Sequence, residues 1–138
     1  MAARGKARGF TLIELLIAIA VVGILTALAV ASYEFAMVKT RRGAAKACLV
    51  EGAQAMERKY TLTFSYEGAT LPACSDDVTD HYTVGFAASE PTATTFRIEA
   101  VPKGSQASSD STCGTLSVDH TGVRLAGDGS AAAVDACW

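Results

Sequence analysis

The residues from Leu15 to Ser32 form an uninterrupted run of 18 side chains without a formal charge. A run of this length is enough for an α-helix to cross the hydrocarbon core of a membrane. Only about 100 residues follow the run, which suffices for one modest hydrophobic core and excludes a large two-domain enzyme. We therefore expect one small head attached to a membrane anchor.

Charge is distributed unevenly along the chain. The first nine residues contain three bases and no acid, whereas residues 60–138 contain three bases against ten acids, a net charge of −7. By the positive-inside rule, the basic end stays in the cytoplasm and the acidic part is exported. The sequence thus predicts a single-pass topology with the head outside the cytoplasm.

The cysteines agree with export. There are four of them, each more than 20 residues from the next: Cys48, Cys74, Cys113 and Cys137. Metal sites usually show closely spaced Cys or His pairs, and the two histidines, His81 and His120, are isolated. An even number of cysteines in a small exported domain indicates disulfides and no metal site. From the residues alone, three pairings remain open.

Three interpretations compete for residues 1–33: a secretory signal peptide, a plain membrane anchor and a pilin leader. Ala29-Val30-Ala31 would serve as a signal-peptide cleavage site. However, Glu14 stands at the start of the apolar region, and the run exceeds the usual length of about 7–15 residues for a signal peptide. The signal-peptide interpretation is weakened accordingly.

A hexapeptide between the basic end and the apolar run decides the matter: Gly9-Phe10-Thr11-Leu12-Ile13-Glu14. Together with the basic segment before it and the apolar run after it, this hexapeptide closely resembles the class III leader of type IV pilins and type II secretion pseudopilins. The resemblance implies that prepilin peptidase removes residues 1–9 by cutting between Gly9 and Phe10, and that Phe10 is then N-methylated. It also implies that Glu14 attracts the N-terminal amine of a neighbouring subunit during filament assembly.

Electrostatics supports this role for Glu14. A carboxylate inside a bilayer costs about 2.5–3.5 kcal/mol on insertion scales, so it needs a compensating partner. Cleavage before Phe10 creates an amine one helical turn away. The chain departs from many pilins at Ala31, where they have a proline. Because proline would remove a helix hydrogen bond, we expect a straighter stem here.

No proline occurs before Pro72, so a helix from Phe10 to about Leu62 is predicted to continue past the membrane. Residues 10–33 would form the transmembrane and filament-core helix, and residues 34–62 an amphipathic continuation. The continuation carries an apolar stripe at helical spacing: Ala45, Cys48, Leu49, Gly52, Met56 and Tyr60. Its basic residues are expected to face solvent or a neighbouring subunit: Lys39, Arg41, Arg42 and Lys46.

Residues 63–138 are predicted to form a globular head. Alternating apolar residues indicate strands near 82–86, 96–100 and 116–118, with a short fourth strand near 123–125. Residues 63–80 are expected to form a connector, 102–112 a Gly/Ser-rich loop, and the tail after Leu125 an irregular segment. The family resemblance implies an α+β pilin fold, with the long helix packed on a three- to four-stranded antiparallel sheet.

The segment from Cys113 to Ser117, together with Cys137-Trp138, resembles the C-terminal region of PilE-type minor pilins. That resemblance implies a Cys113–Cys137 disulfide that closes the C-terminal loop, and Cys48 then pairs with Cys74. We expect Trp138 to pack beside the bridge rather than to bind a ligand.

The resemblance implies a non-enzymatic type IV pilus subunit, most like a PilE-type minor pilin, in pilus assembly and thereby twitching motility, adhesion or DNA uptake. A major pilin, a type II secretion pseudopilin and a competence-type DNA receptor are the alternatives. The implied partners are other pilins through the N-terminal helix, prepilin peptidase, and the assembly platform in the inner membrane. The subunit would reside there, with its head in the periplasm, before it reaches the pilus on the cell surface.

Neither a nucleic-acid partner nor catalysis is expected from the residues. DNA binding depends on neutralising phosphates, and the acidic head argues against it. Asp80-His81 and Asp119-His120 are adjacent residues near strands, where neighbours point to opposite faces and do not act together. No nucleophile, phosphate-loop or metal motif is present, so we expect no enzyme activity and no cofactor.

Overall fold

The structure, a computed structural model, describes residues 9–138, and the predicted leader lies almost entirely outside them. The chain divides into an N-terminal unit that ends at Ala36 and a second unit, Met37–Trp138. Helix α1, Leu12–Thr63, contributes to both. Thr11 caps its start, because the Glu14 backbone N–H donates to the Thr11 hydroxyl at 3.3 Å. The predicted long helix is therefore confirmed.

In the first unit, α1 presents apolar side chains on all sides. Within the described residues, α1 is the one helix whose length and composition would allow it to cross a membrane, and its most apolar window has no buried residue. The hydroxyl of Thr26 donates to the carbonyl of Val22 at 2.7 Å, which satisfies a polar group within the apolar run.

The second unit contains a four-stranded antiparallel sheet in the order β1-β2-β3-β4. The strands are β1 Tyr82–Phe86, β2 Arg97–Pro102, β3 Leu116–Asp119 and β4 Arg124–Ala126. Each strand pairs with the next along the chain. The α+β architecture and the number of strands agree with the prediction.

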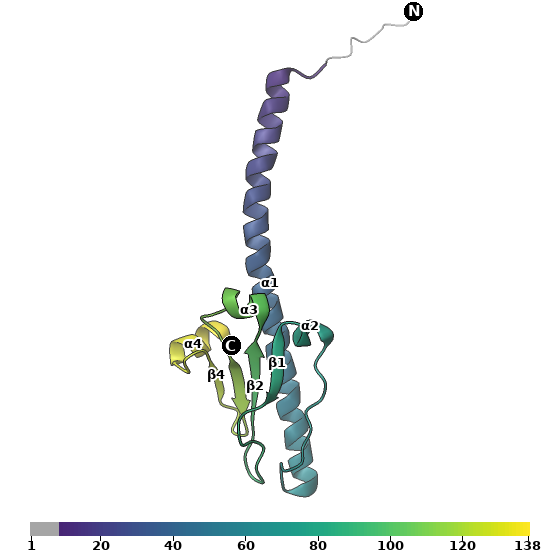
Figure 1. The fold of residues 1–138 in the computed structure, drawn as a ribbon, viewed down its shortest axis with the longest axis vertical. Helices are drawn as coiled ribbons and strands as arrows, with labels where there is room; N and C mark the ends of the chain where they lie inside the picture. The colour runs from purple at the N-terminus through teal and green to yellow at the C-terminus, as the bar shows by residue number, and fades with distance from the viewer. Residues whose placement is uncertain (1–8) are drawn as a thin grey trace, which may run out of the picture. The chain divides into compact units, whose positions relative to one another are not determined.

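One face of this sheet packs against the second half of α1 (Figure 1). The sheet contributes residues that alternate along β2 and β3, and the helix contributes residues from the predicted stripe: Ile98, Ala100, Leu116, Val118, Ala45, Leu49 and Met56. Gly52 marks a close approach of helix to sheet, because a Cβ there would lie 3.1 Å from Ile98 Cδ1. The apolar stripe predicted from its spacing is the core face of the helix.

Three short helices were not predicted. They are α2, Asp76–Thr79, α3, Gly104–Ser109, and α4, Ala131–Cys137. The prediction of a loop at 102–112 and of an irregular tail was wrong, because segments of four to seven residues are too short to show a helical period. Helix α4 does carry a local signal, since Ser130 accepts from the Ala133 N–H at 3.2 Å ahead of an alanine run.

Two disulfides hold the head together, and they pair all four cysteines of the chain. Cys48–Cys74 joins α1 to the connector, with the Cα atoms 5.7 Å apart. Cys113–Cys137 joins the segment before β3 to α4, with the Cα atoms 5.5 Å apart. Each bond therefore fixes a segment outside the sheet to the helix–sheet core.

Candidate functional site

The N-terminal end of the described chain contains the residues predicted to be processed. Gly9 and Phe10 precede α1 and are not helical, and the Phe10 side chain is 80% exposed. Glu14 lies exposed in the first turn of α1, where the helix dipole favours a negative charge. The Gly9–Phe10 bond, at which cleavage is predicted, therefore lies in non-helical chain, two residues before α1 begins.

The stem, defined here as residues 10–35, exposes large apolar side chains along its length. Leu12 is 76% exposed, Ile24 is 64% exposed, and Phe35 near its end is 64% exposed. Monomeric soluble proteins rarely expose contiguous apolar surface on this scale. The stem is therefore a surface that lipid or other protein must cover.

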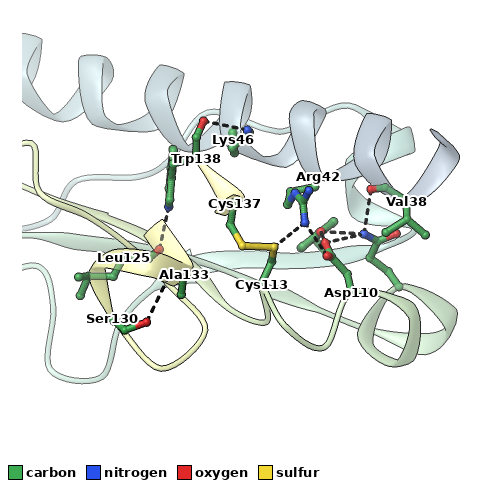
Figure 2. Close-up of a disulfide and its surroundings, with 12 residues drawn as sticks. Val38, Arg42, Lys46, Asp110, Cys113, Leu125, Ser130, Ala133, Cys137 and Trp138 are labelled. Atoms are coloured by element: carbon green, nitrogen blue, oxygen red, sulfur yellow. Dashed lines mark hydrogen bonds and ion pairs between the residues drawn. A yellow bond between two sulfur atoms is a disulfide. The ribbon is translucent and has the colours of Figure 1, made fainter. Parts of the chain in front are cut away.

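A buried polar network ties α1 to the head (Figure 2). Arg42 Nη1 donates to Asp110 Oδ1 at 2.6 Å, and it also contacts Cys113 Sγ of the disulfide. The two charged side chains are only 11% and 7% exposed. The prediction that Arg42 faces solvent or a neighbouring subunit was wrong, because a carboxylate 68 residues away in the sequence binds it inside the head.

Gln106 completes this network. It is fully buried, and the two N–H groups of its Nε2 are shared among three acceptors: the Tyr82 hydroxyl at 3.0 Å, Asp110 Oδ2 at 3.2 Å and the Val38 carbonyl at 3.2 Å. Burial raises the pKa of Tyr82. The hydrogen bonds of Gln106 and Arg42 join α1 to β1 and α3 inside the head, so the network acts as a structural junction.

A cationic groove lies between α1 and β4. It has a volume of about 590 Å³, and we define it by Lys46, Val50, Arg58, Arg124 and Trp138. The Arg124 guanidinium lies 5.2 Å from the centre of the Trp138 ring, and Lys46 Nζ donates to the Trp138 carbonyl at 3.1 Å. Burial, reinforced by the Arg42 and Arg124 charges, lowers the pKa of Lys46. The groove therefore concentrates positive charge on a head that is otherwise acidic.

Sequence reasoning missed this groove. Its cations come from positions 46, 58 and 124, and nothing in their spacing marks them as neighbours. Trp138 lies next in the sequence to the bridged Cys137 and donates its Nε1–H to the Leu125 carbonyl at 2.8 Å. The ring thus forms one wall of the groove.

The described residues contain no cluster of potential metal ligands. Between residues 9 and 138 no three His, Cys, Asp or Glu side chains gather in a way that would hold a metal ion. Burial opposes ionisation of Asp119, yet hydrogen bonds from Thr121 and Val123 outweigh it and lower the pKa of this carboxyl. Asp119 therefore shapes the β3–β4 turn, while His120 is exposed.

Two family models match the chain. The prokaryotic N-terminal methylation motif matches residues 4–30. The model described as type IV minor pilin ComP, DNA uptake sequence receptor, matches residues 31–117, more than half of the chain. A search of the curated proteins gives no match.

Solved structures support the same grouping. A type IV pilin from Shewanella oneidensis is 32% identical over 73% of this chain and 97% of that protein, with a TM-score of 0.54. The non-core minor pilin PilV from Neisseria meningitidis is 20% identical over 69% of this chain and 90% of its own, with a TM-score of 0.50. At that identity, the second likeness concerns the fold alone.

Proposed function

This chain belongs to the family of type IV minor pilins that the ComP model describes, and we propose that it enters the pilus through its stem. The observation that carries the proposal is the change in exposure along α1. The helix is uncovered over the stem, whereas Ala45, Leu49 and Met56 are buried against the sheet. In the pilus, the stems of other pilins would cover the exposed half.

The proposed pathway begins in the inner membrane, with the leader in the cytoplasm and the head in the periplasm. Prepilin peptidase removes residues 1–9 and methylates Phe10, and the assembly platform then extracts the subunit. Because lipid is as apolar as a neighbouring stem, the exchange gains little from the hydrophobic effect. Pairing of Glu14 with the amine of a neighbouring subunit supplies specificity.

The test of this proposal is processing followed by incorporation. Mass spectrometry of the native protein should find N-methylated Phe10 as the first residue. Gly9→Val should leave an uncut precursor in the membrane and none in sheared pili, because a branched side chain does not fit a peptidase that selects glycine. Ala7→Val, two residues upstream, is the control and should be processed. A mature protein that begins at Ser32 would instead establish an ordinary signal peptide.

DNA uptake is the second candidate function, and the match to the ComP model favours it. The leader resemblance leaves a DNA receptor open as an alternative, whereas the acidic head argues against a nucleic-acid partner. If this chain is a DNA receptor, the purified full-length protein should retain duplex DNA, and the affinity should fall steeply as salt rises from 50 to 200 mM. Absence of binding at the lowest salt would remove this candidate and leave the pilus role intact.

A further inference from the structure

The cationic groove contains more positive charge than its own chain compensates. Within residues 9–138, neither Arg58 nor Arg124 forms an ion pair, although Arg124 stacks on Trp138. The Lys46 ammonium donates a hydrogen bond to the backbone oxygen of Trp138 (Figure 2). Glu51 is the acidic side chain among the residues that line the groove, beside the three cations Lys46, Arg58 and Arg124. The groove thus suits a compact, negatively charged ligand.

An acidic turn, whose negative charge is not compensated by nearby cations among residues 9–138, lies at the other edge of the sheet. It consists of Asp76, Asp77 and Asp80, all exposed, in and just after α2. In the described part of the chain, none of their side-chain carboxylates forms an ion pair or accepts a hydrogen bond. Helix α2 contacts β1, whereas the groove adjoins β4, and the two strands are the opposite edges of the sheet (Figure 1).

The two features also lie at the same level of α1. The acidic turn begins two residues after Cys74, which is bonded to Cys48. Lys46 and Cys48 are two residues apart, which separates them by about 3 Å along the helix and about 200° around it. The groove and the turn therefore face nearly opposite directions at almost equal height.

We propose that the cationic groove binds the acidic turn of a second copy of this chain, side by side. The three cations of the groove in one copy then face the three carboxylates of the acidic turn in the other copy. Because the contact uses two different surfaces, it is heterologous, and each bound copy leaves one groove and one turn free for the next. The inference rests on the proposed role as a filament subunit.

Charge favours a protein occupant over DNA. Nucleic acid requires cations distributed along several successive phosphates, and proteins that bind duplex DNA commonly neutralise about 6–10 of them. The groove offers three cations in one place, beside an apolar wall of Val50 and Trp138. A three-carboxylate turn matches this local arrangement.

Carbodiimide cross-linking tests the contact, because the reagent joins a carboxylate directly to an amine with loss of water. The mature full-length protein would be studied in detergent micelles as an equal mixture of unlabelled and nitrogen-15-labelled copies. We expect a cross-linked dimer with an amide between Lys46 of one copy and Asp76, Asp77 or Asp80 of the other. The two isotopes identify it as intermolecular, and amides formed within one copy stay in the monomer band.

Charge reversal gives the sharper test. Arg58→Glu and Arg124→Glu should each reduce this cross-linked dimer at least tenfold. Lys59→Glu makes the same change of charge at the neighbouring position, outside the groove, and should leave it unchanged. Mixing the Arg124→Glu variant with the Asp77→Lys variant should restore at least half of the cross-linked dimer. In that dimer, the Lys46 peptide should come from the Arg124→Glu copy and the acidic-turn peptide from the Asp77→Lys copy.

Two outcomes would overturn the proposal: no cross-link between Lys46 and residues 76–80 of another copy, or an equal loss with Lys59→Glu. If Arg124→Glu abolishes DNA retention and leaves the cross-link intact, the groove is a phosphate site and the proposal fails. The pilus role is judged separately by recovery in sheared pili. Absence from pili with the cross-link present would refute that role and leave the contact standing.

Discussion

The two halves of α1 have the same backbone and opposite surroundings. In the stem, Leu28 is 64% exposed, whereas Leu49 in the head is fully buried. The difference follows from the distribution of apolar residues, which surround the stem and form one stripe in the head. A helix that is apolar all round must be covered from outside, and a helix with one apolar stripe is covered by its own sheet.

Charge differs between the halves in the same way. In the head, Arg42 is compensated by Asp110 of the same chain. In the stem, Glu14 is exposed and has no ion pair within the described residues. The head thus satisfies the buried charge of Arg42 internally, whereas under the proposed assembly the Glu14 charge would be satisfied by another subunit. Variants in each half of α1 and in the head test this division.

Glu14→Ala should have the largest effect, and it should be confined to assembly. The variant should still insert and be cleaved, because the scissile bond lies on the other side of Phe10. Losing one partner of a buried ion pair costs about 3–5 kcal/mol, so incorporation should fall by roughly a few hundredfold. The measurement is the ratio of protein in sheared pili to protein in membranes. Incorporation at the wild-type level would mean that stem packing alone recruits the subunit.

Asp110→Ala should damage the head by a comparable free energy while sparing the stem. It leaves the Arg42 guanidinium buried without its carboxylate, which typically costs about 3–5 kcal/mol of stability. Denaturant unfolding followed by Trp138 fluorescence would measure the loss. Asp135→Ala, at an exposed position of α4, is the control and should lie within about 0.5 kcal/mol of wild type. Equal stability of the two variants would contradict a structural role for the network.

Removing the C-terminal bridge with Cys113→Ser and Cys137→Ser should cost about 2–5 kcal/mol. The loss should appear first around α4 and Trp138, because the bond fixes this segment to the core. Hydrogen exchange would localise it. The matched variant is Cys48→Ser with Cys74→Ser, which should loosen the connector and leave α4 protected. Uniform loss of protection in both would mean that the bridges do not act locally.

The smallest effect should come from pH. The folded-state pKa of Asp119 is lowered, so the stability that this carboxylate contributes is present above its unfolded value of 3.8 and is lost as the pH falls through the folded value. Asp119→Asn should therefore lower Tm at pH 6, and the difference from wild type should shrink below pH 3.8. Thermal unfolding at several pH values would measure it. A constant difference would show that the ionised form is not what matters.

The features predicted from sequence were those with a repeated pattern. The long helix, its core stripe and the four strands each extend over enough residues to show a period. Helices α2, α3 and α4 were missed because they are too short. The Arg42–Asp110 pair and the cationic groove were missed for another reason. They join positions far apart in the chain, which become neighbours only in the folded structure.

The Cys48–Cys74 bond has a mechanical consequence. A filament subunit bears tension along α1, and the two bonded residues are separated by 26 positions in the sequence. If the end of the helix and the connector were pulled out, this segment would extend to about 90 Å. The bond bypasses that length, so the load passes across sulfur atoms instead of through the connector. The head can therefore lengthen little under force, even where its connector sequence changes.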